Sequence, residues 1–233
     1  TIVDREKETV RLGNFNETTK ELTSAAMDRA VAALKRCYAI AASFQAEAIL
    51  AVATSAVREA SNGAAFLDRI QQEVGLVVNL ISGPEEARRI YLGVLSGVEF
   101  RGQPHAIIDI GGGSTELILG TGELHRYLNS SKVGAVRLTA QFINSNPVTD
   151  SEFLALRSYV RGMLENPTQE LRQKLAAGES MQLIGTSGTI ECLATLIAYR
   201  RLEVVPTPLN GFQFTYAELT KLLEELQIGR AHV

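Results

Sequence analysis

Three consecutive glycines inside an otherwise apolar stretch constrain the fold of this chain more than any other feature. Residues 105–119 read HAIIDIGGGSTELIL. The apolar residues on both sides are typical of buried strands, and the glycines allow a tight turn that larger side chains would prevent. The sequence therefore predicts a strand, a turn and a strand over residues 105–119, with a bare backbone at the tip.

The tip of this hairpin has the composition of a phosphate-binding loop. Successive backbone N–H groups over residues 111–114 suit a phosphate, whose oxygens accept several hydrogen bonds at once. Asp109 precedes the loop and Glu116 follows it. Two carboxylates beside a bound phosphate repel it unless a divalent cation lies between them, and ligands that are all oxygen suit Mg²⁺. We therefore expect a phosphate at the loop and a Mg²⁺ ion held by Asp109 and Glu116.

Other phosphate-binding patterns do not match this stretch. A triple glycine by itself is often a flexible hairpin, but the two flanking acids favour a binding loop. The stretch lacks the Gly-Lys-Ser/Thr that opens a helix in a Walker A loop, and it lacks the spacing of the Gly-x-Gly-x-x-Gly dinucleotide turn. The pattern resembles instead the hairpin-type phosphate loops of the actin-like, sugar-kinase-like ATPase fold.

A pair of glutamates follows another predicted strand. Residues 76–81 have the apolar character of a buried strand, and SGPEE at residues 82–86 begins a helix with proline near its start. The helix dipole favours acidic residues at this position, which by itself explains both glutamates. The same junction of strand and helix also places a carboxylate where open α/β sheets bind their ligands. Both interpretations stand at this point.

A second turn rich in glycine and hydroxyl groups lies closer to the C-terminus. Residues 181–184 predict a strand, and GTSGT at residues 185–189 leads into an apolar helix through residue 197. Backbone N–H groups at the start of a helix bind anions. The sequence therefore predicts a second anion site here.

The remaining pattern is that of a mixed α/β chain. Apolar residues at three- and four-residue intervals predict helices over residues 22–44, 62–74, 151–164 and around residue 171. Strands are expected over residues 1–15, 48–53 and 124–130, and a helix opens at residues 134–138. Thr215 and Glu218 form a capping box for a final helix. Apolar strands that alternate with helices place the chain in the α/β class.

Composition and cysteine usage indicate which cellular compartment and which binding partners to expect. The chain of 233 residues has a formal net charge of −3, which offers no electrostatic basis for binding nucleic acid. Cys37 and Cys192 lie in helical apolar patterns without a C-x-x-C motif, so we expect core thiols in the reducing cytoplasm. No membrane span is expected, because polar residues interrupt the apolar stretch over residues 39–57. His105 and His125 are expected at the surface.

Four motifs in order resemble one known family. They are ATSAVREA at residues 53–60, ISGPEEAR at residues 81–88, IDIGGGSTE at residues 108–116 and GTSGT at residues 185–189. Together they resemble the exopolyphosphatase and guanosine pentaphosphate phosphohydrolase family, over residues 3–226. The resemblance implies an actin-like fold of two domains that hold the substrate in a cleft between them.

The resemblance also implies a role for each motif. Glu86 would be the general base that activates water, Asp109 and Glu116 would hold Mg²⁺, and Arg58 would pair with a phosphate oxygen. The backbone of two turns would cradle phosphates: Gly111, Gly112, Gly113 and Ser114 in the first, and Gly185, Thr186, Ser187, Gly188 and Thr189 in the second.

The implied reaction is hydrolysis of the terminal phosphoanhydride bond of inorganic polyphosphate with Mg²⁺. An aligned water and neutralised phosphate oxygens suffice for this chemistry. Removal of the terminal 5′-phosphate of pppGpp is an alternative, because both substrates present a terminal anhydride. A regulator that binds polyphosphate or nucleotide without hydrolysing it is another, and a kinase of the same fold is the weakest. A homodimer is a possible assembly of the full-length protein.

The same resemblance sets expectations for the domains. Residues 1–102 are expected to be the remainder of the first actin-like domain, and residues 103–227 the N-terminal part of the second, so that both are incomplete. The first phosphate loop of the family, Asp-x-Gly-Ser-Asn-Ser, is expected upstream of residue 1, which leaves the activity of this fragment open. Residues 228–233, IGRAHV, are interpreted as a sequencing-adapter artefact.

Overall fold

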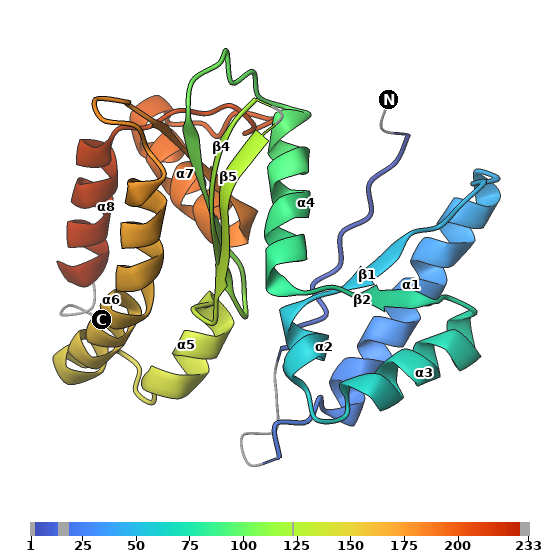
Figure 1. The fold of residues 1–233 in the computed structure, drawn as a ribbon. Helices are drawn as coiled ribbons and strands as arrows, with labels where there is room; N and C mark the ends of the chain where they lie inside the picture. Colours follow the sequence, from blue (N-terminus) through green and yellow to red (C-terminus); the bar gives the residue numbers. More distant parts are fainter. Residues whose placement is uncertain (1–2, 14–18, 123, 229–233) are drawn as a thin grey trace. The chain divides into compact units, whose positions relative to one another are not determined.

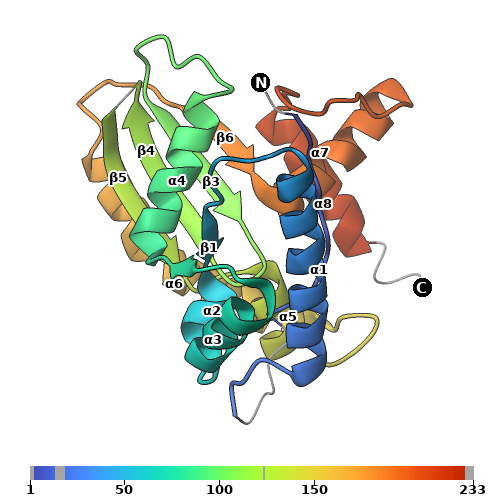
Figure 2. The same cartoon turned by 90° about the vertical axis from the view of Figure 1, so that its right-hand side faces the viewer.

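The chain forms two compact units, which are divided in the sequence between Gly83 and Pro84. The computed structural model describes residues 3–13, 19–122 and 124–228 (Figures 1 and 2). Each unit has its own β-sheet and its own apolar core. The chain is therefore of the α/β class that its sequence predicts.

The first unit is built on a small parallel sheet. Its elements are α1 (Ser24–Ser43), β1 (Ala51–Ala53), α2 (Ser55–Glu59), α3 (Gly63–Val74) and β2 (Val78–Leu80). Strands β1 and β2 pair in parallel, with Ala51 opposite Val78. Helices α1 and α3 pack against each other over a core that includes Leu22, Phe66 and Ile70.

Local signals set the helix ends in this unit. The Thr23 hydroxyl accepts a hydrogen bond from the Ala26 N–H at 3.3 Å and caps α1. Helix α3 ends at Gly75, whose φ of 78° favours glycine. Asn62 occupies the N-cap position of α3, but its side chain does not cap that helix. Its amide instead bonds the N–H and the carbonyl of Leu22, at 2.9 and 3.0 Å, and so ties the segment before α1 to the start of α3.

The second unit contains a four-stranded mixed sheet. Its elements are α4 (Gly83–Leu95), β3 (His105–Ile110), β4 (Thr115–Thr121), β5 (Leu124–Ser131), α5 (Ala135–Phe142), α6 (Asp150–Gln173), β6 (Gln182–Thr186), α7 (Ser187–Leu202) and α8 (Tyr216–Ile228). The strand order is β5-β4-β3-β6, with β6 parallel to β3 and the other neighbours antiparallel. The predicted hairpin over residues 105–119 is confirmed, and it supplies the two central strands.

Helices cover both faces of this sheet. On one face Tyr91 of α4 packs with Ile107 and Ile118, and on the other Leu171 of α6 packs with Leu117. Helices α4 and α6 consequently lie on opposite sides of the strands in Figure 1. Because successive residues of a strand point to opposite faces, side chains two residues apart share a face.

Tyr91 holds α4 on the sheet. Its side chain is fully buried, and its hydroxyl donates to the carbonyls of Gly122 and Leu124. The ring crosses β4 at Gly120, where a Cβ atom would lie 2.3 Å from it. This close approach requires glycine, so the position of α4 depends on both residues.

The boundary between the units differs from the predicted one. The sequence predicts it between residues 102 and 103, whereas the structure divides the chain between Gly83 and Pro84. Helix α4 belongs to the second unit because Ala87, Tyr91 and Val94 pack against the sheet of that unit. No local signal marks this choice, since the apolar stripe of a helix does not identify the surface that will cover it.

Helix α6 is longer than predicted. The sequence predicts one helix over residues 151–164 and another around residue 171, and the structure has one continuous helix, Asp150–Gln173. Pro167 lies inside it and is buried. The Thr168 hydroxyl donates to two carbonyls of the preceding turn, at 2.7 and 2.8 Å. Packing of Leu171 on the sheet keeps the helix continuous against the tendency of proline to break it.

Other expectations from the sequence are wrong. Residues 3–13 form no strand, and the rest of the strand predicted over residues 1–15 lies outside the described residues. Cys37 and Cys192 are exposed rather than core thiols. His105 is only 2% exposed, because it opens β3 and stacks on Phe100 with a distance of 4.0 Å between ring centroids. His125 is exposed, as predicted.

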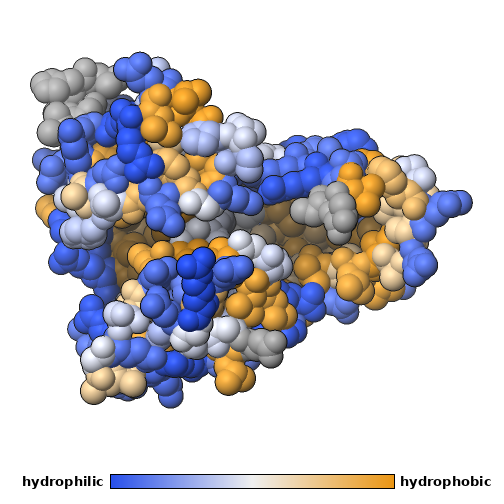
Figure 3. Space-filling model, turned by 90° about the horizontal axis from the view of Figure 1, so that it is seen from above, coloured by the Kyte–Doolittle hydropathy of each residue, from blue (hydrophilic) through white to orange (hydrophobic). Residues whose placement is uncertain are grey.

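Apolar side chains reach the surface of both units among hydrophilic ones, orange against blue in Figure 3. Leu50 and Val77 are exposed next to the first sheet, and Leu183 is exposed on the edge strand β6 of the second. No helix in the described part of the chain is long and apolar enough to cross a membrane.

Candidate functional site

Four polar side chains form a row across the sheet of the second unit. Asp109 on β3 pairs with Glu116 on β4 and with Thr186 on β6, and Glu116 pairs with Ser130 on β5. Cross-strand partners share a face of a sheet. This face also carries Ile107, two residues before Asp109, and is therefore the one that α4 covers. We call these four residues the carboxylate row.

Each carboxylate of the row accepts a hydrogen bond from a hydroxyl group. Ser130 Oγ donates to Glu116 Oε1 at 2.7 Å, and Thr186 Oγ1 donates to Asp109 Oδ2 at 2.6 Å. The Ser114 hydroxyl also bonds the Glu116 carboxylate. Such bonds orient a carboxylate and stabilise its charged form. The row therefore presents two oriented carboxylates side by side.

Glu116 is the most buried charged group of the row, with 1% of its surface exposed. Burial raises the pKa of its carboxyl above the ordinary value, and the negative charges of Glu86 and Asp109 raise it further. The hydrogen bonds from Ser130 and Ser114 act in the opposite direction. An electrostatic effect of this kind requires that the Glu86 carboxylate lies near the row. The charge of Glu86 therefore acts on the buried carboxyl of the row.

The chemistry of this group fits a magnesium ion. Mg²⁺ takes one or two carboxylates and completes its coordination with water and phosphate oxygens. Asp109 and Glu116 offer such oxygens, and a cation between them offsets the repulsion that raises the pKa of Glu116. Within residues 3–13, 19–122 and 124–228, no cluster of three or more His, Cys, Asp or Glu side chains could hold a metal. The donor set thus suits an ion that binds together with a phosphate.

The glycine loop between β3 and β4 is closed by its own backbone and held from outside by α5. The Gly111 N–H donates to the Ser114 carbonyl at 3.0 Å. The carbonyls of Gly111 and Gly112 accept from the N–H groups of the first residue of α5 and of Arg137, at 2.9 and 3.0 Å. The Gly113 carbonyl accepts from Arg137 Nε at 2.8 Å. Three successive carbonyls of the loop therefore point toward the start of α5.

This arrangement determines where the N–H groups of the loop point. A trans peptide plane directs its carbonyl and its N–H to opposite sides. Because the carbonyls of Gly111, Gly112 and Gly113 face α5, the N–H groups that follow them, up to Ser114, face away from it. Among the described residues, no backbone carbonyl accepts a hydrogen bond from these three N–H groups. They form a set of neighbouring donors of the kind that binds phosphate, between Asp109 and Glu116.

Glycine is required where α5 approaches the loop. A Cβ atom on Gly134 would lie 2.4 Å from backbone atoms of Gly112 and Gly113. A Cβ atom on Gly112 would lie 3.3 Å from Val136 Cγ2. The run of glycines is therefore needed for close packing of backbone on backbone as well as for the turn.

The two glutamates in the first turn of α4 differ in what they contact. Glu85 accepts from Arg88 at 2.7 and 2.9 Å and from Arg89 at 2.9 Å, and these partners, Arg88 first, lower its pKa to about 2. Glu86 instead acts electrostatically on Glu116. Glu85 thus pairs within its own helix, and the charge of Glu86 acts on Glu116 of the carboxylate row.

The second predicted anion site lies between β6 and α7. Thr186 occupies the N-cap position of α7, but its hydroxyl donates to Asp109 and makes no cap hydrogen bond. The first N–H groups of α7 therefore receive no hydrogen bond from the Thr186 side chain. Uncapped N–H groups at the start of a helix are the donors that bind anions in other proteins. Ser187 has a φ of 74°, a left-handed conformation that is strained for serine. Gly185 packs against Ile190, where a Cβ atom would lie 2.5 Å from Cγ2.

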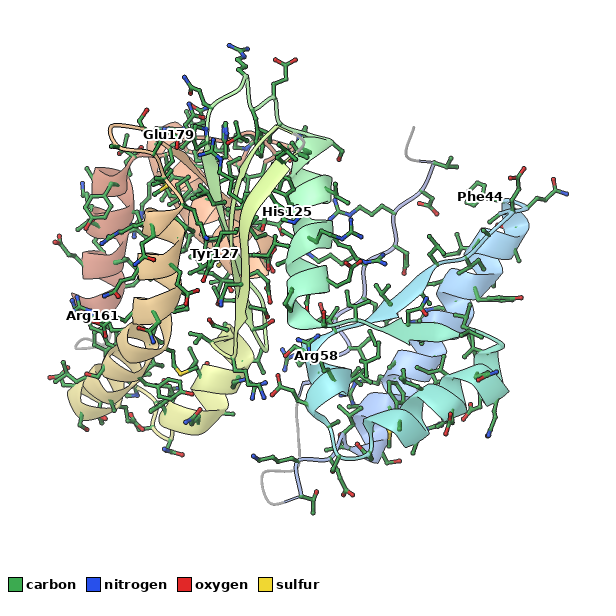
Figure 4. All side chains as sticks on the ribbon, viewed as in Figure 1. Phe44, Arg58, His125, Tyr127, Arg161 and Glu179 are labelled. Atoms are coloured by element: carbon green, nitrogen blue, oxygen red, sulfur yellow. The ribbon has the colours of Figure 1, made fainter. Side chains whose placement is uncertain are left out.

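The predicted site residues are distributed over both units. Glu86, the carboxylates and both turns, including Gly188 and Thr189 at the start of α7, belong to residues 84–233. Arg58 lies in the first unit, on α2 (Figure 4). Its Nη1 donates to the Ile81 carbonyl at 2.7 Å. All the predicted site residues except Arg58 therefore come from one unit.

Sequence reasoning missed two residues of this region. Ser130 bonds Glu116 from β5, and Arg137 bonds the glycine loop from α5. A signal for Arg137 exists in GAVR at residues 134–137, a glycine and a cation that open a helix soon after the binding hairpin. Ser130 has no such signal, because its partner depends on the register between β4 and β5, which a strand pattern alone does not give.

Comparison with known proteins assigns the chain to a family. A family model described as the Ppx/GppA phosphatase family matches residues 1–231. Exopolyphosphatase 2 of Mycobacterium tuberculosis is 32% identical over 199 residues, which cover 83% of this chain and 61% of that protein. The chain thus spans less than two thirds of the length of this curated relative.

Two solved structures are similar along almost the whole chain. The crystal structure of an exopolyphosphatase from Cytophaga hutchinsonii has a TM-score of 0.83 at 30% identity, covering 95% of this chain and 70% of that one. The crystal structure of the Aquifex aeolicus member of the Ppx/GppA family has a TM-score of 0.71 at 30% identity, covering 94% of this chain and 68% of that one.

Proposed function

Because the chain belongs to the Ppx/GppA phosphatase family, we propose that its protein hydrolyses the terminal phosphoanhydride bonds of inorganic polyphosphate in a Mg²⁺-dependent reaction. Relatives named exopolyphosphatase support this choice of substrate. The observation that carries the proposal is the grouping of Glu86, Asp109 and Glu116 beside a loop whose N–H groups point away from the helix that holds it.

The two glycine-containing turns and the carboxylate row bind and orient the substrate phosphates in this proposal. The N–H groups of the glycine loop donate to oxygens of the terminal phosphates, and those at the start of α7 bind a further phosphate oxygen. Asp109 and Glu116 would hold Mg²⁺, and the ion when bound would neutralise phosphate oxygens and stabilise the charge of the transition state. Ser130 and Thr186 keep the two carboxylates oriented, as residues that contact metal ligands do elsewhere.

Glu86 is the proposed general base. Hydrolysis requires a water in line with the P–O bond that breaks. The Glu86 carboxylate accepts a proton from this water while the water oxygen bonds to phosphorus. The bridging oxygen then leaves with the shortened polyphosphate, and inorganic phosphate is released.

Phosphate release by the full-length protein tests the proposal. Inorganic polyphosphate and pppGpp are offered separately, because each presents a terminal anhydride. We expect release from polyphosphate that EDTA abolishes and excess MgCl₂ restores. Release from pppGpp alone would reassign the substrate to a nucleotide, and tight binding of polyphosphate without release would identify a regulator. No release and no binding of either compound contradicts the proposal.

Two neighbouring glutamates provide a matched pair of variants. Glu86→Gln removes the proposed base, and we expect hydrolysis to fall by at least ~10²-fold while polyphosphate still binds. Glu85→Gln changes the adjacent residue, which pairs with Arg88 and Arg89, and should leave hydrolysis close to that of the wild type. The measurements are initial rates and calorimetric binding with Mg²⁺. Equal losses in both variants would show that the helix start, and not a base, had been damaged.

A further inference from the structure

Arg137 contacts the glycine loop in two ways. Its backbone N–H donates to the Gly112 carbonyl at 3.0 Å, and its Nε donates to the Gly113 carbonyl at 2.8 Å. The two acceptors are successive peptide groups of the loop. One residue of α5 therefore determines the orientation of two peptide planes.

The loop also completes the start of α5. The N-cap residue of this helix is Gly134, which has no side chain to bond the first N–H groups. The carbonyls of Gly111 and Gly112 take that place. Helix α5 is in turn fixed to the sheet, because the Thr115 hydroxyl donates to the Val133 carbonyl and Leu138 is buried. The loop is consequently held against a rigid support.

The Nε contact is the part of this support that depends on a side chain. A guanidinium donates along fixed directions in its plane, whereas an ammonium rotates freely about a flexible stem. A charged donor also bonds a carbonyl more strongly than a neutral one. The Gly113 carbonyl and the Ser114 N–H belong to the same peptide plane, so the Arg137 side chain sets the direction of the last N–H of the loop.

We propose that Arg137 is a positioning residue of the phosphate-binding loop: its side chain turns the peptide between Gly113 and Ser114 so that the Ser114 N–H points toward the bound phosphate. This inference rests on the proposed function for the identity of the ligand. It concerns a different contact, however, because Arg137 acts on the backbone of the loop and not on the phosphate.

Two variants remove this contact in different degrees. Arg137→Lys keeps the positive charge and the backbone N–H but loses the directed Nε donor, and Arg137→Gln loses the charge as well. Arg126→Gln is the matched control, since Arg126 is an arginine of the same unit that pairs with Glu179 at 2.7 Å. None of the three changes removes a buried apolar side chain, so all should fold, which thermal unfolding verifies.

The experiment measures binding and the loop itself in the full-length protein. Tripolyphosphate with Mg²⁺ is titrated into ¹⁵N-labelled protein, and the amide signals of Gly112, Gly113 and Ser114 are followed together with their hydrogen exchange. In the wild type we expect these signals to shift on titration. In both Arg137 variants we expect faster exchange at Ser114 in the presence of tripolyphosphate, and binding weaker by roughly ten- to a hundred-fold. Arg126→Gln should match the wild type.

The outcomes separate this inference from the proposed function. Loop signals that respond to tripolyphosphate in a wild type without hydrolysis, together with weaker binding in both Arg137 variants, would overturn the proposed function and support the inference. Wild-type binding in both Arg137 variants would overturn the inference and leave the proposed function standing. Equal effects in the Arg126 variant, or loop signals that do not respond in the wild type, would also overturn the inference.

Discussion

At the scale of single residues, Glu116 shows that this site is not arranged for stability. A carboxyl that is 1% exposed, near two other carboxylates, is costly to ionise without a cation. Its pKa is raised in the folded protein, chiefly by burial. The contribution of Glu116 to the stability of the folded protein is therefore fully present below the pKa that this carboxyl has in the unfolded chain. It is lost as the pH rises through the higher pKa that the carboxyl has in the folded protein.

Glu116→Gln should relieve this cost. In EDTA we expect the variant to have a higher Tm than the wild type at neutral pH, because glutamine does not ionise. The difference should shrink as the pH falls toward the ordinary glutamate value of about 4.5. With Mg²⁺ the wild type should gain Tm and the variant should not, because ligand binding stabilises only a protein that binds. A variant less stable than the wild type at every pH would contradict this prediction.

Thr186 belongs to the second anion turn, and its hydroxyl serves the row instead of its own helix. Thr186→Val keeps the shape of the side chain and removes the donor to Asp109, so we expect weaker Mg²⁺ activation, with about ten-fold more Mg²⁺ needed for half-maximal hydrolysis. Thr186→Ser keeps the hydroxyl and should restore the wild-type requirement. The measurement is a Mg²⁺ titration of the rate at saturating polyphosphate. Identical titrations for the valine and serine variants would rule out this role.

At the scale of elements, helix ends were the most predictable features. The capping box of Thr215 and Glu218 before α8 occurs as predicted, and α3 ends at the predicted residue 74, followed by the left-handed Gly75. Each depends on residues three or four positions apart. Proline predicted the end of a helix less well. Helix α6 continues through Pro167, because packing of the helix on the sheet offsets the destabilising effect of the proline. Local chemistry thus predicts how helices end better than whether they continue.

The start of α6 gives a prediction for pH. Glu152 accepts from Ser145 and from the backbone of Asn144 and Thr149, and these bonds, that from Ser145 first, lower its pKa to about 2. Because the pKa of Glu152 is lower in the folded protein, its carboxylate stabilises the fold at pH values above the unfolded pKa of about 4.5. This stabilisation is lost as the pH falls toward 2.

Glu152→Gln should therefore lower the urea midpoint at neutral pH, with a difference from the wild type that disappears between about pH 4.5 and pH 2. Glu165→Gln, at an exposed position of the same helix, serves as the control and should change the midpoint little at any pH. A deficit in Glu152→Gln that persists at pH 2 would mean that the carboxylate charge is not its source.

At the scale of the whole molecule, the chain consists of two units, and family membership and its α/β architecture confirm the predicted actin-like fold class. All the predicted chemistry except Arg58 lies in residues 84–233. With a formal net charge of −3, this chain has no overall attraction for a polyanion. Binding of polyphosphate is therefore expected to depend on local groups, namely bound metal, particular arginines and the backbone N–H groups of the two turns.

Arg58 is the residue through which the first unit is expected to contribute to phosphate binding. Arg58→Gln should lower kcat/KM for polyphosphate by about 10²-fold, the loss typical when one charged or hydrogen-bonding group leaves a phosphate transition state. Arg29→Gln is the matched control, because Arg29 also donates to a backbone carbonyl of the same unit, that of Val10 at 3.1 Å. The two variants are compared by steady-state kinetics and Tm. Equal kinetic losses would assign to Arg58 only its bond to the Ile81 carbonyl.

The sequence by itself determined the local chemistry of this protein: the glycine hairpin, its flanking acids, the helix start with two glutamates and the second turn. These features depend on residue types and short spacings, which a sequence displays directly. Tertiary structure alone decided that Glu86 rather than Glu85 lies near the carboxylate row, that Ser130 and Thr186 orient it, and that Arg137 holds the loop. It also decided that α4 belongs to the second unit. These outcomes depend on strand register and on packing between residues far apart in the chain, and no local pattern encodes either.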